Sequence, residues 1–222
     1  MSSKRFPGKT LVELIDRPLL AWVIQRVRCT TSVSDIVVST SNDQSDDAIQ
    51  DFCEQRKIPC FRDSLNNVAT RMSKTVTHMG ATEFIRISGD SPLIDPSVID
   101  HAVALFSLGN YDLVTNVLHR TFPKGQSVEV LKAETFHKLS RQMWDPLDQE
   151  HVTRLYYRDH VQLLIQDFRS DQDFGEEQFS VDTPEDLEIV KLLLKASNGE
   201  PPGWKDLVKL KNDLLVSLPC PN

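Results

Sequence analysis

Hydrophobic residues recur along this chain with the period of a helix in some segments and in short continuous runs in others. Residues 17–28 place Leu19, Leu20, Val23, Ile24 and Val27 on one helical face, and Pro18 stands near the start, where a helix tolerates proline. Buried strands are predicted at 35–41, 58–61, 83–88 and 111–116, and helices at 45–56, about 65–78 and from Pro96 onward. This alternation predicts a three-layer α/β architecture with a parallel or mostly parallel sheet.

The second half of the chain departs from this alternation. Residues 119–160 interrupt it, and we expect them to form an insertion that acts as a flap or a dimer arm. Residues 179–196 predict one more strand and a helix with Asp182 or Thr183 near its cap and Pro184 in its first turn. The chain is therefore expected to form one domain over 1–196, followed by a linker and an amphipathic helix within 197–222.

Composition limits the classes of function. A net charge of −7 argues against a general nucleic-acid binder, which needs clustered Lys and Arg. There is no signal-peptide pattern and no apolar run near the roughly 20 residues of a membrane span. The cysteines are too widely spaced for a Cys-x-x-Cys zinc site and suggest no disulfide scaffold: Cys29, Cys53, Cys60 and Cys220. We expect a cytoplasmic protein that binds neither nucleic acid nor membrane.

The opening residues, MSSKRFPGK, are rich in groups that bind phosphate. Arg5 and Lys9 flank the turn Phe6-Pro7-Gly8, so a rigid turn with a free backbone N–H at Gly8 carries a cation at each end. Neighbouring phosphates repel one another unless such charges neutralise them. A frayed basic terminus is the alternative interpretation.

Two aspartates follow predicted strands. Asp90 stands in ISGDSPLIDP and Asp182 in VDTPEDL. The carboxyl ends of parallel strands meet at one edge of a sheet, where ligands bind, and Mg²⁺ prefers a few carboxylate oxygens together with water and phosphate. The pair is therefore a candidate metal site, and two independent helix caps are the alternative. Arg86 lies within a predicted buried strand and needs an anionic partner, from the protein or from a substrate.

Several segments, in order along residues 1 to about 195, resemble the cytidylyltransferases of the spore-coat polysaccharide type, relatives of the CMP-octulosonate and acylneuraminate synthetases. They are MSSKRFPGK, RPLLAWVIQR, IVVSTS, PCFRDS, IRISGDSPLIDP, RTFPKGQSVEV, DQEHVT and VDTPEDL. The resemblance implies a Rossmann-like nucleotidyltransferase fold and the reaction of CTP with an acidic sugar, giving a CMP-sugar and pyrophosphate with Mg²⁺ as cofactor. It is also compatible with a homodimer.

The resemblance also implies roles for individual residues. Ser3, Arg5, Gly8 and Lys9 match the triphosphate loop, Arg62, Ser64 and Gly89 match nucleotide-binding positions, Asp90 and Asp182 match the metal carboxylates, and Arg86, Glu129 and His151 lie in segments on the sugar side. Arg5, Lys9, Asp90 and Asp182 are the catalytic candidates, acting by positioning and electrostatics without a general base. Structural alternatives are a surface ion pair for Arg62, a solvated strand residue for Glu129 and a buried, hydrogen-bonded histidine for His151.

The chain also departs from the family pattern. Arg62-Asp63-Ser64 replaces Arg-Gly-Ser, Asn67-Val68 replaces Asp-Val, and Gly125-Gln126-Ser127 replaces a Gly-x-Asp run. These changes imply weaker activity or a different sugar. The family's phosphate loop follows a first strand that is expected to be missing here, so an upstream start, a fragment, or a catalytically inactive binding or assembly module remain open. A nucleotidyltransferase that uses a sugar phosphate is a further alternative.

Overall fold

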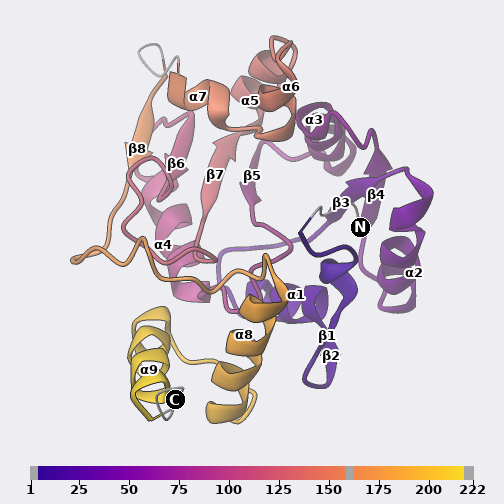
Figure 1. The fold of residues 1–222 in the computed structure, drawn as a ribbon. Coiled ribbons are helices and arrows are strands. Elements are labelled where there is room, and N and C mark those ends of the chain that lie inside the picture. The colour runs from indigo at the N-terminus through magenta and orange to yellow at the C-terminus, as the bar shows by residue number, and fades with distance from the viewer. Residues whose placement is uncertain (1–4, 159–162, 218–222) are drawn as a thin grey trace.

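The computed structural model describes residues 5–158 and 163–217, so Ser3 and Cys220 lie outside the described residues. The predicted alternation is present as helices α1 (Leu19–Arg28), α2 (Asp47–Gln55), α3 (Val68–Met79) and α4 (Pro96–Ser107), with strands β3 (Val38–Ser41), β4 (Cys60–Asp63), β5 (Glu83–Arg86) and β6 (Leu113–Thr115) (Figure 1). The remaining elements are η1 (Lys9–Leu11), β1 (Glu13–Leu14), β2 (Arg17–Pro18), η2 (Gln44–Asp46), β7 (Glu129–Lys132), α5 (Ala133–Ser140), α6 (Pro146–Glu150), α7 (Arg154–Arg158), β8 (Ile165–Asp167), α8 (Pro184–Ala196) and α9 (Trp204–Ser217).

The strands of the central layer form two separate sheets. β3 pairs with β4 in parallel, and a four-stranded sheet has the order β5-β7-β6-β8. Within the latter, β7 is antiparallel to both β5 and β6, whereas β6 is parallel to β8. β5, β6 and β8 thus share one direction and β7 opposes them, so this sheet is mixed. Among the described residues no strand lies between β3 and β5, where the central layer is interrupted.

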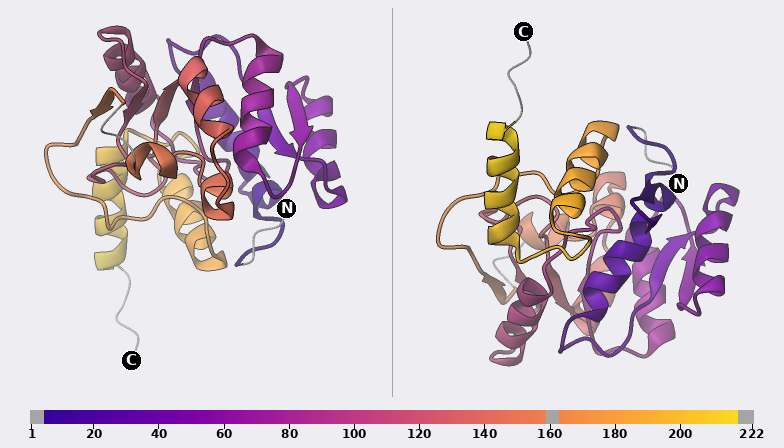
Figure 2. Two further views of the ribbon diagram at one scale, coloured as in Figure 1. Left: turned by 90° about the horizontal axis from the view of Figure 1, so that it is seen from above. Right: turned by 90° about the horizontal axis from the view of Figure 1, so that it is seen from below.

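Helices cover both faces of the sheet, which gives the expected three layers (Figure 2). Successive residues of a strand point to opposite faces, and here Val114 of β6 belongs to one apolar core whereas Leu113 belongs to another. The first core collects side chains of α1, α4, α8 and α9, and the second those of α3, α5 and α7. Leu207 of α9 is fully buried in the first core, so the C-terminal helix packs against the rest of the molecule.

Residues 119–160 contribute to the sheet itself. β7 lies between β5 and β6, and its backbone pairs with both. The part of this region that forms β7 is therefore a central strand rather than an insertion. The strand expected at the start of 179–196 is also absent from the described residues. Only an isolated bridge, between Lys124 and Gln178, forms just before that segment. The sequence predicts neither the β1–β2 hairpin nor β8, because these short segments carry no strong periodicity.

Gly125 fixes the approach of the β6–β7 connection to the segment that leads into α8. Its φ is +95°, and a Cβ at this position would stand 2.6 Å from the backbone N of Ser180 and 2.7 Å from the carbonyl carbon of Phe179. The neighbouring residue, Lys124, is hydrogen-bonded to the same segment, since the Phe179 N–H donates to the Lys124 carbonyl at 2.8 Å. Only glycine fits this close approach of two backbones.

We expect Gly125→Ala to destabilise the protein by about 2–4 kcal/mol, because a left-handed backbone and an overpacked contact act together. Gly80→Ala is the matched control, since its φ is +64° but nothing lies within 4 Å of the added Cβ. The control should cost only about 1 kcal/mol. Urea unfolding of both variants measures this, and equal losses would show that the contact with 179–180 is unimportant.

Candidate active site

Lys9 stands at the centre of a cluster that joins three distant parts of the chain. Its Nζ donates to Asp90 Oδ2 at 2.8 Å, to Asp182 Oδ1 at 2.9 Å and to the Val181 carbonyl at 2.8 Å. The two carboxylate oxygens contact one nitrogen, so they lie at most 5.7 Å apart, the sum of those two distances. Arg5 adds a second cation, with its Nη2 3.1 Å from Asp182 Oδ1. The structure thus brings together four of the residues selected from sequence.

The Pro7-Gly8 turn places the Lys9 side chain. Gly8 is in the left-handed region with φ 76°, and it caps the short helix η1, where Leu11 donates to the Gly8 carbonyl at 3.1 Å. Phe6 packs against the main apolar core and anchors the loop from its other side. A glycine at the turn and an apolar residue before it therefore hold a loop that would otherwise be a free basic terminus.

The two aspartates are held by backbone contacts and by the cap of α8. Val181 donates its N–H to the Asp90 carbonyl at 2.9 Å, which ties together the segments that carry them. Thr183 is the N-cap of α8 and forms a capping box with Asp186, whose Oδ2 accepts from the Asp182 N–H at 2.9 Å. The prediction of a cap at 182–183 is confirmed, with Thr183 as the capping residue. The Asp182 side chain is then left for Lys9 and Arg5.

The electrostatics of the cluster favour the ionised forms. Burial opposes ionisation of Asp182, but the hydrogen bond and charge of Lys9, with Arg5, hold the pKa of this carboxyl below its ordinary 3.8. Burial likewise opposes the charge of Lys9, yet Asp90 and Asp182 raise its pKa above 10.5. Lys9 is only 12% exposed, whereas Arg5 is 67% exposed. Arg5 is thus the cation that is open to an incoming ligand, and Lys9 is the one that holds the aspartates.

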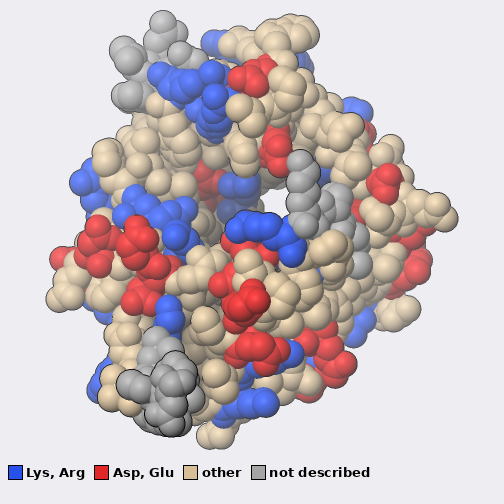
Figure 3. Space-filling view, in the orientation of Figure 1, with Lys and Arg blue, Asp and Glu red and all other residues tan. Residues whose placement is uncertain are grey.

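The donors of the cluster fit a hard cation. Asp90, Asp182 and the Val181 carbonyl offer oxygens that already surround one positive charge, and oxygen ligands are those that Mg²⁺ prefers. The described residues include no group of three or more His, Cys, Asp and Glu suited to a metal. A cation here would complete its shell with water or phosphate, as Mg²⁺ commonly does. On the face shown in Figure 3, basic and acidic side chains lie side by side around a central hollow.

A second polar cluster joins two of the residues expected on the sugar side. Arg86 Nη1 donates to Glu129 Oε2 at 2.5 Å, and the Tyr157 hydroxyl donates to Glu129 Oε1 at 2.5 Å. The anionic partner of Arg86 is therefore a protein residue. Glu129 is 1% exposed, so its interpretation as a solvated strand residue is wrong. The direct pairing of β5 with β7 puts Arg86 opposite Glu129.

Tyr157 is a site residue that sequence reasoning missed. Burial, and then the charge of Glu129, raise the pKa of its hydroxyl, which stays protonated and donates. The same hydroxyl lies 3.2 Å from Thr115 Oγ1 at the end of β6. The only local signal was the Leu155-Tyr156-Tyr157 run after the DQEHVT segment, and such a run predicts simple burial equally well.

Of the nucleotide-side candidates, Arg62 and Ser64 make hydrogen bonds within the protein, whereas Gly89 adjoins the Lys9 cluster through Asp90. Arg62 donates to the Ser41 and Asp43 carbonyls and to the side chains of Asp47 and Gln50, at 2.6–2.9 Å. Its contacts match the ion-pair interpretation, and none of them reaches the Lys9 cluster. Ser64 accepts from the Asn67 N–H at 3.1 Å next to the cap of α3. Gly89 directly precedes Asp90, and its position is open enough for a Cβ, which would meet only Leu20 at 3.8 Å.

One further sequence interpretation, that of His151, is changed by the structure. His151 is exposed at the end of α6, so the interpretation of a buried, hydrogen-bonded histidine is wrong. Asp63, which stands in one of the departures from the family pattern, forms an ion pair, because Lys74 Nζ lies 2.7 Å from its Oδ2. The pKa of Asp63 is lowered, chiefly by this hydrogen bond with Lys74.

The fold is of the α/β type that nucleotidyltransferases have, and comparison with known proteins specifies the class and the family. The cytidylyltransferase family model matches residues 1–210, and the chain belongs to this family. It is 32% identical to the spore coat polysaccharide biosynthesis protein SpsF of Bacillus subtilis over 211 residues, which are 90% of this chain and 85% of that protein. The resemblance noted from sequence is confirmed.

Two solved structures show the same fold. A cytidylyltransferase from Leptospira borgpetersenii superposes with a TM-score of 0.92 at 22% identity, over 100% of this chain and 95% of that one. A CMP:2-keto-3-deoxy-manno-octonic acid synthetase solved with CTP superposes with a TM-score of 0.67 at 16% identity, over 88% and 95% of the two chains. None of the helices in the described part of the chain has the length and apolar character that a membrane crossing requires.

The lowered pKa of Asp182 predicts a pH dependence with a defined sign. Because the folded-state pKa lies below 3.8, the ionised carboxylate stabilises the folded protein above that pH, and the contribution is lost as the pH falls through the lowered value. Lys9→Met should move the titration midpoint of Asp182 upward. Carboxyl NMR titration measures the shift, with Lys205→Met, at an exposed ion pair with Asp171, as control. An unchanged Asp182 midpoint in Lys9→Met would contradict the assignment of Lys9 as its main partner.

Proposed function

We propose that this protein transfers CMP from CTP to an acidic sugar, with release of pyrophosphate, in the synthesis of a surface polysaccharide or glycan. The observation that carries the proposal is the convergence of Asp90 and Asp182 on Lys9, with Arg5 beside them. Two carboxylates and two cations in one cluster suit a triphosphate that arrives with a divalent metal. The family membership supports cytidine as the base.

Each residue of the cluster has a role in this proposal. Asp90 and Asp182 would hold Mg²⁺, which when bound supplies Lewis-acid polarisation of the phosphate. Arg5, the exposed cation, would bind the pyrophosphate end of CTP and stabilise the charge that grows on it as the sugar hydroxyl attacks the α-phosphorus. Lys9 would exchange part of its contact with the aspartates for phosphate oxygens. Positioning and charge are sufficient for phosphoryl-type transfer, so no general base is assigned.

The sugar side is proposed at the second cluster. Arg86 is held by Glu129, so its charge is largely neutralised and it would position Glu129 rather than bind a sugar carboxylate alone. Glu129 and Tyr157 offer hydrogen-bonding groups to sugar hydroxyls, and His151 is exposed on the segment that precedes α7. We further propose a cytoplasmic location and a homodimer, on the basis of the composition and of the family resemblance.

A second candidate is a binding or assembly module of this family that lacks catalysis. The observation that favours it is the interruption of the central layer between β3 and β5, directly beside the loop that carries Gly89 and Asp90. Isothermal calorimetry with CTP and Mg²⁺ separates the candidates. Micromolar binding supports the enzyme, and absence of binding supports the module.

For the enzyme, Asp90→Asn and Asp182→Asn should each lower turnover by about 10²–10³-fold, because each removes charge from the site where phosphate charge develops. Asp171→Asn is the matched control, since that carboxylate pairs with Lys205 at an exposed position. Pyrophosphate release from CTP is measured with 3-deoxy-manno-octulosonic acid and with an acylneuraminic acid, after thermal melting has shown that the variants fold. Full turnover of Asp90→Asn would remove this residue from the site.

A further inference from the structure

The segment between Asp90 and α4 is buried along its whole length. Residues 91–95 lie between β5 and α4, and all five of them are buried. Leu93 and Ile94 are 0% exposed. Each backbone N–H and C=O in such a segment needs a hydrogen-bond partner from elsewhere in the chain. The groups that supply these partners therefore determine where the chain runs immediately after Asp90.

The side-chain amide of Gln126 bonds two backbone groups of this segment. Its Nε2 donates to the Leu93 carbonyl at 2.7 Å, and its Oε1 accepts from the Asp95 N–H at 2.8 Å. Only this orientation of the amide satisfies both groups, since a carbonyl accepts and an N–H donates. Gln126 stands in one of the departures from the family pattern and is 0% exposed. A buried, uncharged donor and acceptor thus hold the segment at two points.

Gln126 is itself fixed by the connection between β6 and β7. Its carbonyl accepts from Asn116 Nδ2 at 2.7 Å, and its N–H donates to the Pro123 carbonyl at 3.0 Å. Asn116 is also 0% exposed, and its Oδ1 accepts from the Val128 N–H at 2.9 Å. The close backbone contact of Gly125 with residues 179–180 lies directly beside it. The amide of Gln126 is therefore a rigid anchor.

The far end of the segment is tied to three helices. Arg26 of α1 donates from its Nε to the Ile94 carbonyl at 2.8 Å. The Asp95 side chain caps α4, since its Oδ1 accepts from the Ser97 N–H at 2.9 Å. Its Oδ2 accepts from the N–H of Trp204, the first residue of α9, at 2.8 Å. Residues 94–95 consequently have a fixed place, and movement is limited to the part nearer Asp90.

Asp90 has one further backbone anchor of its own. Its carbonyl accepts from the Val181 N–H at 2.9 Å, and the next carbonyl bonded by a distant side chain is that of Leu93. Pro92 lies between them, and its fixed φ limits the paths that the chain can take over this short distance. A shift of the Leu93 carbonyl would therefore displace Asp90, whose Oδ2 lies 2.8 Å from Lys9 Nζ.

We propose that Gln126 is a positioning residue of the active site, which holds Asp90 in place to share a divalent cation with Asp182. The proposal rests on the proposed function, in which these two aspartates are the metal ligands. Mg²⁺ requires its oxygen ligands at about 2.0–2.1 Å in near-ideal octahedral geometry, so a small displacement of one carboxylate weakens binding. Removal of a group that orients a metal ligand typically lowers metal affinity or activity by about 10–100-fold.

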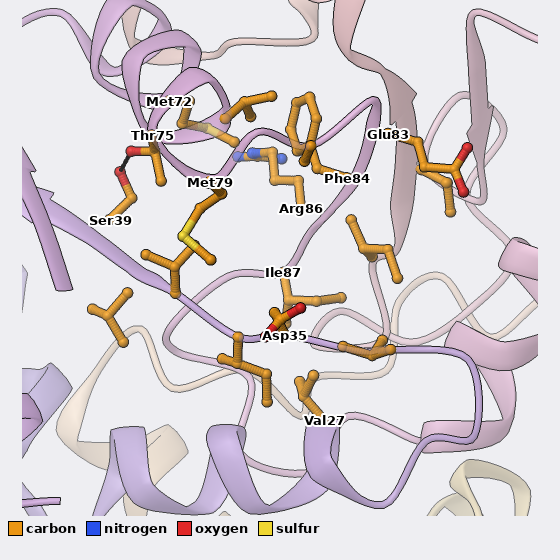
Figure 4. A pocket seen from close by; sticks show the side chains of 18 of the residues that line it. Val27, Asp35, Ser39, Met72, Thr75, Met79, Glu83, Phe84, Arg86 and Ile87 are labelled. Carbon is orange, nitrogen blue, oxygen red and sulfur yellow. Dashed lines mark hydrogen bonds between the residues drawn. The ribbon is translucent and has the colours of Figure 1, made fainter. Parts of the chain in front are cut away.

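The test compares Gln126→Met with Thr75→Val in the full chain. Methionine fills nearly the same space as glutamine but forms neither hydrogen bond. Thr75 of α3 is the matched control, because it is 4% exposed and its hydroxyl also makes two hydrogen bonds, with Ser39 Oγ at 2.9 Å and with the Arg71 carbonyl at 2.8 Å (Figure 4). Neither bond involves residues 90–95. Both variants should melt about 5–10 °C below the wild-type protein.

Two readouts separate positioning from stability. The Val181 amide should exchange about tenfold faster in Gln126→Met than in Thr75→Val, although their Tm values are similar, because its acceptor is the Asp90 carbonyl. The Kd for CTP with Mg²⁺, measured by calorimetry, should rise by about 10-fold or more in Gln126→Met and stay within about twofold of wild type in Thr75→Val. Gln126→Asn is a second variant, since its amide is one methylene shorter and cannot reach both backbone groups, and it should change both readouts in the same direction.

The proposal is overturned if Val181 exchanges equally fast in Gln126→Met and Thr75→Val, or if Gln126→Met binds CTP and Mg²⁺ as tightly as the wild-type protein. It is equally overturned if Thr75→Val weakens binding as much as Gln126→Met, because the effect would then be one of stability alone. A wild-type protein that does not bind CTP and Mg²⁺ contradicts the proposed function instead. In that case the exchange rate of Val181 decides by itself whether Gln126 holds Asp90 in place.

Discussion

The ion cluster around Lys9 is the interaction on which the arrangement of the site depends. One ammonium group joins residues 81 and 173 positions away along the chain, and without it two carboxylates less than 6 Å apart would repel each other. Their closeness is enforced from three directions: the Pro7-Gly8 turn, the Val181 to Asp90 backbone bond and the capping box of α8. A cluster held in this way keeps its two carboxylates and its two cations in a fixed arrangement before any ligand binds.

In the second polar cluster, two strands of the sheet hold ionised side chains in the interior of the protein. Arg86 and Glu129 are paired because β7 lies against β5, and their hydrogen bond compensates part of the cost of placing ionised groups under the helices. The Tyr157 hydroxyl, on α7, donates to the other carboxylate oxygen of Glu129. Both clusters lie at the carboxyl end of β5, because Arg86 is its last residue and Asp90 follows in the next loop.

Strand β5 connects the four-stranded sheet to the ion cluster around Lys9. Because the loop with Gly89 and Asp90 continues directly from β5, the order of this strand and the geometry of the metal-type cluster are physically linked.

The sequence by itself determined the local features of the molecule: the helical face of α1, the strand character of β3, β5 and β6, the cap and first-turn proline of α8, and the paired cations of the opening loop. These follow from side-chain periodicity and capping, which act within a few residues. Only the tertiary structure decided that β7 enters the sheet against β5, that Glu129 is the partner of Arg86, that Arg62 is held by α2 and its flanking turn, and that His151 is exposed. Strand order and the partners of buried charges depend on residues tens of positions apart, and no short-range pattern encodes those distances.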